Sequence, residues 1–434
     1  MATIDHEAFF IDGAWRPAQS DDRFDIISPR SEQVIGSVPA ASTADIDAAV
    51  AAARRAFDQG EWPRLTPAER ADYLTRMADA IAKRQEELAE LITEELGCTL
   101  FLSQVYQVVS PVMSLNYNAE IGRNLDTSQV RLSDLGPLAA SSEGGSIIPM
   151  AGASLVVQEP VGVVAAFPAY NFAFPAVPQK VAPALIAGCT AVVKVTEPNP
   201  LATFIYGDIC QEVGLPPGVI NIVAARAPEA EYLVRHPGVD MVSFTGSVQT
   251  GARIAAACGE LIKPCVLELG GKSAAIVLDD AKLEDALPVL IGASVGTNAG
   301  QSCVALTRLV VPAARYDEYA EALVEGFRSL KIGDPMEADT VISPLVTERQ
   351  RDRVEEYVEL ARKVRAGTFS VNTFAADLGS PFGGWKKSGI GREHGPTAYE
   401  EFLQYKTISV DPSRDLPESV TAGARRGTGP GTAG

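Results

Sequence analysis

Val161-Gly-Val-Val-Ala-Ala-Phe167 is a run of apolar residues of the type that forms a buried strand, and it begins the part of the chain that decides the fold. From here on, apolar strands alternate with helical segments, which predicts a parallel sheet with helices on both faces. Nucleotides bind such sheets at the carboxyl ends of the strands. The expected strands are 161–167, 190–195, 219–223, 241–244 and 265–269, and the expected helices are 175–187, 201–213, 227–235 and 252–258.

The residues before this alternation are also expected to be regular, and the alternation resumes after residue 273 around Cys303. Two helices have recognisable start signals, Ser42-Thr-Ala-Asp45 and Thr66-Pro-Ala-Glu69. The expected elements are a helix at 43–57, two helices within 66–96, a helix at 101–125 with Pro111 near its start or at a kink, and an exposed strand at Leu155–Glu159.

The composition is that of a globular protein: 434 residues, 46% hydrophobic and 21% charged, suggest two or three domains. A net charge of -18 argues against nucleic acid or an anionic membrane as a partner. No apolar run approaches the roughly 18 residues of a membrane span, and the N-terminus lacks a signal pattern. Six cysteines without C-x-x-C spacing favour reduced cytoplasmic thiols over a disulfide framework or a metal site.

One cysteine stands in a segment that suits a reactive residue, Gly296-Thr-Asn-Ala-Gly-Gln-Ser-Cys303. Glycines let the backbone approach a ligand closely, and a strand is expected just after it, at 306–311. A thiol there can act as a nucleophile if a base or a positive field favours the thiolate. Taken alone, the residue is better explained as a small buried hydrophobe, as most free cysteines are.

Several strand ends carry polar residues that could serve a nucleotide or a reaction, although each has a simpler explanation. Phe244-Thr-Gly-Ser247-Val-Gln-Thr-Gly251 opens a helix whose N-terminus could hold a pyrophosphate, or is an ordinary strand–turn–helix. Lys194 and Glu197 could hold ribose hydroxyls, with the carboxylate repelling a 2′-phosphate, or form a surface ion pair. Asn171 could donate to an oxyanion or cap a turn. Glu268 could be a general base or join an ion pair between domains.

Taken in order, these pieces resemble the NAD(P)-dependent aldehyde dehydrogenase family, and the resemblance runs along nearly the whole chain. The pieces that carry it are Tyr170-Asn171-Phe172, Lys180, Lys194 with Glu197, Phe244-Thr-Gly-Ser247, Glu268-Leu-Gly-Gly-Lys272, Gly300-Gln-Ser-Cys303, Ser380-Pro-Phe-Gly-Gly384 and Ser388-Gly-Ile-Gly-Arg392-Glu393.

The resemblance implies an α/β fold with a Rossmann-type parallel sheet in a cofactor domain, a second α/β catalytic domain and a small β element for oligomerisation. A homodimer or homotetramer is therefore expected, because an unpaired strand edge needs a partner. The implied boundaries are 1–127 with 160–266 for the NAD-binding domain, 267–394 for the catalytic domain, 128–159 with 395–411 for the oligomerisation element, and 412–434 for a disordered tail.

It also implies a reaction. Cys303 would attack an aldehyde to form a thiohemiacetal, the Asn171 amide would hold the oxyanion, and loss of hydride would leave a thioester. Glu268 would then activate water, with Lys180 near its proton path. The expected cofactor is NAD, with NADP less favoured. Implied cofactor contacts are Phe167, Pro168, Tyr170, Lys194, Glu197, Gly246, Ser247, Gly251, Leu269 and Gly270, and implied substrate contacts are Phe172 and Phe382.

The pattern departs from the family after a helix predicted at 347–363. Here the chain runs directly from Lys363 into Arg365-Ala-Gly-Thr, so that on the order of 80 residues expected from the family are absent, a large part of a typical domain. The absent part includes a Glu-Ile-Phe-Gly-Pro motif that contacts the nicotinamide side of the cofactor. In addition, Gln404 stands where some relatives have a proton-relaying glutamate. The alternatives are thus a nucleotide-binding remnant, a thiol esterase, an assembly subunit or, less favoured because Glu268 is present, a coenzyme A-acylating enzyme.

Overall fold

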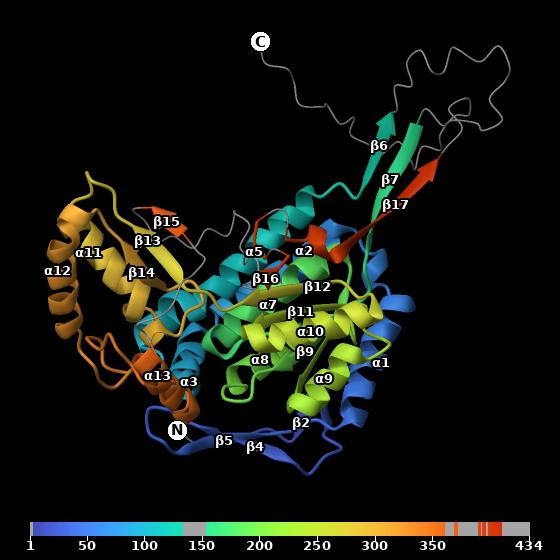
Figure 1. The fold of residues 1–434 in the computed structure, drawn as a ribbon. Coiled ribbons are helices and arrows are strands. Elements are labelled where there is room, and N and C mark those ends of the chain that lie inside the picture. Colours follow the sequence, from blue (N-terminus) through green and yellow to red (C-terminus); the bar gives the residue numbers. More distant parts are fainter. Residues whose placement is uncertain are drawn as a thin grey trace, which may run out of the picture.

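The computed structural model describes residues 3–132, 153–360, 369–371, 389–391, 393–395 and 398–409. In this part of the chain the largest sheet has eight strands in the order β16–β12–β11–β8–β9–β10–β2–β3 (Figure 1). Five neighbouring strands are parallel: β12 (Cys265–Leu269), β11 (Met241–Gly246), β8 (Val163–Phe167), β9 (Thr190–Val195) and β10 (Ile220–Ala224). Antiparallel strands extend both edges: β16 (Gly389–Ile390), β2 (Ala8–Ile11) and β3 (Ala14–Pro17).

Helices cover both faces of this sheet, as the alternation of apolar and helical segments predicts. Every residue of β8 and of β10 is buried, as expected for strands with helices on both sides. One face packs against α1 (Thr43–Asp58), α9 (Ala227–Arg235) and α10 (Val248–Leu261), and the other against α7 (Ala173–Ala187) and α8 (Leu201–Glu212). Beyond α7 and α8 lie α2 (Pro67–Ala82), α3 (Gln85–Leu96) and α5 (Val109–Asn124).

The predicted helix starts at Ser42 and Thr66 are confirmed. Each side-chain hydroxyl accepts a hydrogen bond from a backbone N–H of the first turn. In return, the carboxylate of Asp45 in one helix and of Glu69 in the other accepts from the backbone N–H of the capping residue. The helix expected at 101–125 is instead divided into α4 (Leu100–Leu102), a π-helical turn at Ser103–Gln107, and α5. Pro111 accounts for the irregular turn, because it has no N–H for the carbonyl of Gln107.

A second, thinner lobe contains Cys303. Its sheet has the order β14–β13–β15 and is parallel, with β14 (Leu306–Val310), β13 (Ser273–Ile276) and β15 (Phe369–Val371). The helices α11 (Leu283–Ile291), α12 (Tyr316–Arg328) and α13 (Glu348–Leu360) accompany it (Figure 1). Its core is small, and large apolar side chains are exposed, among them Ile332 at 78%, Tyr316 at 64% and Val310 at 51%.

Two further small sheets belong to the described part of the chain. The antiparallel sheet of β6 (Ser128–Leu132), β7 (Ala153–Pro160) and β17 (Leu403–Ser409) projects from the body (Figure 1). It contains the strand expected at Leu155–Glu159. Near the N-terminus, β1 (Ile4–Asp5), β5 (Val34–Pro39) and β4 (Arg23–Ile27) form the other. The remaining short helices are Trp62–Arg64, Tyr170–Phe172, Gly292–Gly296, Asn298–Gly300, Ala313–Arg315 and Glu400–Phe402.

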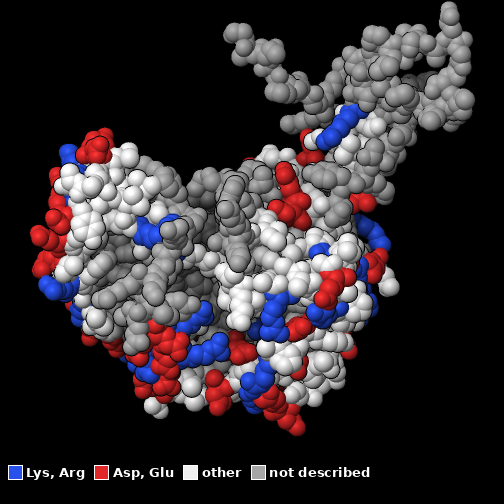
Figure 2. Space-filling view, viewed as in Figure 1, with Lys and Arg blue, Asp and Glu red and all other residues white. Residues whose placement is uncertain are grey.

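Some predicted features lie outside the described residues: the junction at Lys363–Arg365, the substrate contact Phe382 and the tail at 412–434. Within the described residues, no helix is both long and apolar enough to cross a membrane. On the face drawn in Figure 2, Lys and Arg side chains are interspersed with Asp and Glu and do not gather into one basic patch.

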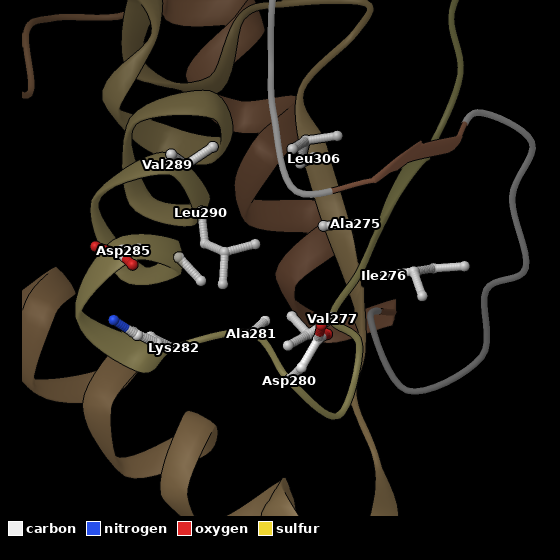
Figure 3. Close-up of a pocket in the computed structure, with 11 residues that line it drawn as sticks. Ala275, Ile276, Val277, Asp280, Ala281, Lys282, Asp285, Val289, Leu290 and Leu306 are labelled. Carbon is white, nitrogen blue, oxygen red and sulfur yellow. The ribbon is translucent and has the colours of Figure 1, made fainter.

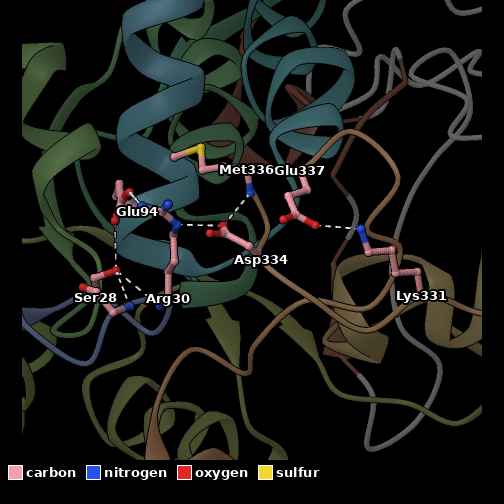
Figure 4. Close-up of polar contacts among 8 residues, drawn as sticks. Ser28, Arg30, Glu94, Lys331, Asp334, Met336 and Glu337 are labelled. Atoms are coloured by element: carbon pink, nitrogen blue, oxygen red, sulfur yellow. Dashed lines mark hydrogen bonds and ion pairs between the residues drawn. The ribbon is translucent and has the colours of Figure 1, made fainter.

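Arg30 ties the two lobes together (Figure 4). Its guanidinium donates to the carboxylate of Glu94 on α3 and to that of Asp334, which follows α12, each at 2.7 Å. Glu94 also accepts from the Ser28 hydroxyl at 3.0 Å and is only about a tenth exposed. The three charges therefore form a bridge from the large sheet's helical layer to the Cys303 lobe.

Replacing Arg30 with Ala is expected to lower the free energy of unfolding by about 1 kcal/mol, because it leaves the poorly exposed Glu94 carboxylate without its cation. Urea unfolding measures this. Arg351→Ala, which removes an exposed pair on α13, serves as the control and should change stability by less than about 0.5 kcal/mol. Equal stability of the Arg30 variant and wild type would contradict the bridge.

Candidate functional site

The predicted cofactor contacts lie at one edge of the large sheet. Phe167, Lys194, Gly246 and Leu269 are at or beside the carboxyl ends of β8, β9, β11 and β12, and these four strands are neighbours in the order β12–β11–β8–β9. Pro168, Tyr170, Glu197 and Gly270 follow directly in the connecting loops. The structure therefore brings these residues, far apart in sequence, to the edge where α/β sheets bind nucleotides.

The helix that follows β11 has the features of an anion site. Ser247 caps α10, accepting from the backbone N–H of Thr250 at 3.2 Å, which leaves other N–H groups of the first turn for a ligand. Gly251 allows this helix to lie close to β12: a Cβ atom there would be 2.4 Å from a methyl carbon of Leu269. At Gly270, by contrast, a Cβ would meet nothing within 4 Å. These positions thus leave room for a ligand beside the helix N-terminus.

Lys194 lies near the carboxyl end of β9, two strands away from β11, and Glu197 follows in the next loop. Burial lowers the pKa of the Lys194 ammonium, and the carboxylate of Glu197 acts in the opposite direction. The pair is therefore close enough to interact, as the sequence suggests. Such an amine and carboxylate can both bind ribose hydroxyls.

The loop before Cys303 is held in an unusual backbone conformation. Three consecutive residues, Asn298, Ala299 and Gly300, have positive φ angles of 51°, 52° and 79°. Glycine adopts this region freely, but alanine does so at a cost of about 1 kcal/mol, so surrounding contacts must hold the turn. These contacts position the cysteine that follows.

The contacts come largely from Asn171. The side-chain amide of Asn171 donates to the backbone carbonyl of Gln301 at 2.9 Å. The backbone carbonyl of Asn171 accepts from the side-chain amides of Asn298 and Gln107, each at 3.1 Å. Asn171 thus lies against the Cys303 loop, as predicted, and its amide keeps a second N–H for another acceptor. The sequence reasoning missed Asn298 and Gln107. The only available signal was that Asn298 stands in the same glycine-bounded segment.

Cys303 is half-buried, and in the free protein its surroundings on balance favour the thiol over the thiolate. Burial raises the pKa of its thiol to about 11, and the carboxylates of Glu268 and then Glu393 contribute in the same direction. This differs from the lowered pKa that a reactive cysteine needs. A base, or a positive charge brought by a ligand, must therefore assist its ionisation.

Alkylation of Cys303 by iodoacetamide without cofactor is accordingly expected to be slow at neutral pH and to rise about tenfold per pH unit as the pH approaches the pKa of about 11. Peptide mapping separates this site from the other cysteines, and Cys303→Ser is the blank. A plateau reached below the ordinary thiol pKa of 9.0 would contradict the arrangement of carboxylates around the thiol.

Glu268 lies within β12, between two backbone partners, Thr245 of β11 and Gly389 of β16, and it is only 5% exposed. Lys180, on α7, is fully buried and donates to the Thr245 hydroxyl and to Glu393, each at 2.6 Å. The predicted base and lysine therefore both adjoin Thr245, the base through strand pairing and the lysine through a hydrogen bond. The sequence reasoning quoted Glu393 among the matching pieces but gave it no role, and it missed Thr245.

Phe172, the predicted substrate contact, packs edge-on against Tyr106 with ring centroids 5.3 Å apart. Burial is the main cause that raises the pKa of the Tyr106 hydroxyl, and the charge of Cys303 adds to it, which places this ring near the thiol. Tyr106 is thus an aromatic residue at the site that the sequence reasoning missed, because it comes from the irregular turn before α5.

A cavity of about 320 Å³ lies elsewhere, between α11 and the sheet of the second lobe (Figure 3). Val277, Leu290 and Leu306 line it with apolar surface, and Asp280, Lys282 and Asp285 stand at one end. It contains none of the predicted site residues. In the described part of the chain, no group of three or more His, Cys, Asp or Glu side chains is placed to hold a metal ion.

Comparison with known proteins agrees with this geometry. The model of the aldehyde dehydrogenase family matches residues 15–363 and 359–408, which is most of the chain. This chain belongs to the aldehyde dehydrogenase family. It is 33% identical to a geranial dehydrogenase of Castellaniella defragrans, an alignment that covers 94% of this chain and 99% of that protein.

Solved aldehyde dehydrogenases share the fold. A Mycobacterium tuberculosis aldehyde dehydrogenase, solved in complex with NAD+, superposes with a TM-score of 0.87 at 30% identity, covering 96% of this chain and 100% of that one. A mutant of aldehyde dehydrogenase C from Pseudomonas syringae, in complex with NAD+ and octanal, has a TM-score of 0.84 at 28% identity, with coverage of 96% and 100%. The predicted family and fold are therefore confirmed.

Proposed function

We propose that this protein oxidises an aldehyde to a carboxylic acid with NAD, through a covalent intermediate on Cys303. The observation that carries the proposal is the convergence of the Cys303 loop, the Asn171 amide and the Glu268 carboxylate at the carboxyl edge of the nucleotide-type sheet. Two solved relatives are described as complexes with NAD+, and one of these also holds octanal.

In the first half of the reaction, the Cys303 sulfur attacks the carbonyl carbon and forms a thiohemiacetal. The thiol proton passes to solvent, and Glu268 takes no part until the second half of the reaction. The free N–H of the Asn171 amide and the backbone N–H of Cys303 would hold the developing oxyanion. Bound NAD supplies the acceptor for the hydride that leaves the former aldehyde carbon, and a thioester on Cys303 results.

In the second half, Glu268 removes a proton from a water molecule, whose oxygen adds to the thioester carbon. The carbon–sulfur bond breaks, the acid departs and Cys303 is regenerated. Glu268 is almost fully buried, so few water molecules can reach its carboxylate at once. This burial favours activation of a single, positioned water molecule.

The residues fit the cofactor best at its adenosine and pyrophosphate end. Lys194 and Glu197 would hold the ribose, and Gly246, Ser247 and Gly251 the pyrophosphate at the N-terminus of α10. The Glu197 carboxylate would repel a 2′-phosphate, so we propose NAD over NADP. Phe167, Pro168, Tyr170, Leu269 and Gly270 complete the proposed contacts.

We also infer that the catalytic domain is shortened after residue 363. In support, the family model matches in two pieces that meet at 359–363, and the alignment with the geranial dehydrogenase extends over 489 positions, more than this chain's 434 residues. The exposed apolar residues of the second lobe are in line with lost covering elements. Weaker anchoring of the nicotinamide side could then slow oxidation by about 100-fold.

The domain boundaries given from the sequence are kept as a proposal. They assign 1–127 and 160–266 to the NAD-binding domain and 267–394 to the catalytic domain. The projecting sheet β6–β7–β17 would then pair copies of the chain in a homodimer or homotetramer, because its outer strand edges lack neighbours within the described residues.

The proposal is tested by mixing the protein with NAD and a panel of aliphatic, aromatic and amino aldehydes and following formation of NADH. Oxidation of at least one aldehyde, with more activity on NAD than on NADP, is the expected result. A folded, NAD-binding sample that produces no NADH with any aldehyde would remove the proposal.

The thin second lobe favours one competing function, a thiol esterase that has lost oxidation. Hydrolysis of p-nitrophenyl acetate that needs Cys303 but is indifferent to NAD, without any NADH formation, would support it. Formation of an acyl-CoA on addition of coenzyme A would instead indicate an acyltransferase.

A further inference from the structure

Among the ion pairs of the described residues, the most buried is that of Lys180 and Glu393. Lys180 is 0% and Glu393 4% exposed, and their side chains meet at 2.6 Å. The two residues come from distant parts of the chain, α7 and the segment just after β16. Two fully desolvated charges at this distance are costly to bury, which calls for an explanation of their place.

The contacts of this pair connect it to the strand neighbours of Glu268. The Lys180 ammonium also donates to the Thr245 hydroxyl at 2.6 Å, and Thr245 is the backbone partner of Glu268 in the neighbouring strand. On the other side of β12, Gly389 is the partner of Glu268, four residues before Glu393. The segment that contains Gly389 and Glu393 therefore also lies beside the proposed base, Glu268.

We propose that Glu393 is a positioning residue for the general base: it holds the Lys180 side chain on Thr245, beside Glu268. This inference rests on the proposed function, because the base works in release of the acid from Cys303. The proton that Glu268 takes is the one from water, the hydroxide oxygen bonds to the thioester carbon, and sulfur leaves as the thiolate.

The need for Glu393 follows from the burial of Lys180. A buried ammonium is costly unless an anion lies against it, and the carboxylate of Glu393, at 2.6 Å, is that anion. A cation beside Glu268 in turn favours the ionised carboxylate, which is the form that can act as a base. Glu393 therefore fixes where this cation lies relative to the base without touching substrate.

Among the described residues, titratable groups near this arrangement include Cys303, whose thiol pKa both carboxylates raise, Glu401, which lies beside Gly391, and His394, which follows Glu393 in the chain. Tyr117 and His394 line a small polar cavity beside α7. Another cation beside α7, Arg70, lies at the C-terminal end of that helix and donates to the carbonyl of Ile186. It cannot replace Lys180 at the Thr245 hydroxyl.

The test compares Glu393→Gln, Glu393→Asp and the control Glu400→Gln, which makes the same chemical change at an exposed position in the same segment. Stopped-flow formation of NADH separates the burst, which reports acylation, from steady-state release, measured across pH. Glu393→Gln is expected to keep the burst, to lower steady-state turnover about tenfold at neutral pH, and to move the acid limb of its pH profile about one unit higher. Glu393→Asp should recover part of the lost turnover and part of the shift of the acid limb. Glu400→Gln should match wild type in both quantities.

An unchanged or acid-shifted limb in Glu393→Gln would overturn the inference, because Lys180 would then act without its partner. If that variant does not fold, the double variant Lys180→Met/Glu393→Leu removes both charges at once, a replacement that buried pairs often tolerate, and the same shift is expected. If wild type forms no NADH, the proposed oxidation fails. The pH comparison is then made on hydrolysis of p-nitrophenyl acetate, where an unshifted profile would remove this inference separately.

Discussion

Replacing Cys303 with Ala is expected to abolish NADH formation, with a loss on the order of 10⁴-fold or more in turnover. The reason is that every proposed bond to the substrate passes through this sulfur, and neither Glu268 nor Asn171 can take its place. The same variant should lose ester hydrolysis and should fold normally, since the thiol packs into no large core cluster. Stopped-flow NADH formation and the far-ultraviolet circular dichroism spectrum measure the two parts of this prediction.

Cys265→Ala is the matched control, because Cys265 is also half-buried but lies at the amino end of β12, away from the site. It should retain wild-type turnover. Turnover by Cys303→Ala above a hundredth of the wild-type value would mean that the aldehyde is oxidised without a covalent intermediate, and the mechanism would have to be withdrawn.

Replacing Glu268 with Gln is expected to stop the reaction halfway. Attack by Cys303 and loss of hydride would still give a burst of NADH, but steady-state turnover should fall on the order of 10²- to 10⁴-fold, because no carboxylate remains to activate water. The substitution keeps the size of a side chain that is 5% exposed, so packing changes little. Mass spectrometry of the stalled protein should find the acyl group on Cys303.

Glu260→Gln makes the same chemical change on the surface of α10, where Glu260 pairs with Arg235, and should leave both burst and turnover unchanged. A Glu268→Gln variant that loses the burst as well would assign this carboxylate to the attack of the thiol and not to release of the acid.

The sequence alone determined the large sheet and the edge at which its motifs meet. Val161–Phe167 and the strands after it are apolar on both faces, and such runs separated by helical segments leave few arrangements other than a parallel sheet covered by helices. Because the carboxyl ends of parallel strands share one edge, Lys194, Ser247 and Glu268 could be placed together without coordinates.

Only the tertiary structure decided which side chains touch at that edge. Lys180 and Glu393 are 213 residues apart, and Asn171 and Gln301 are 130 apart. Local pattern carries no information on such pairs, since they depend on how loops and the segment after β16 return to the sheet. The raised pKa of Cys303 likewise follows from the burial and the two carboxylates that the fold places around it, which no spacing of residues in the chain reveals.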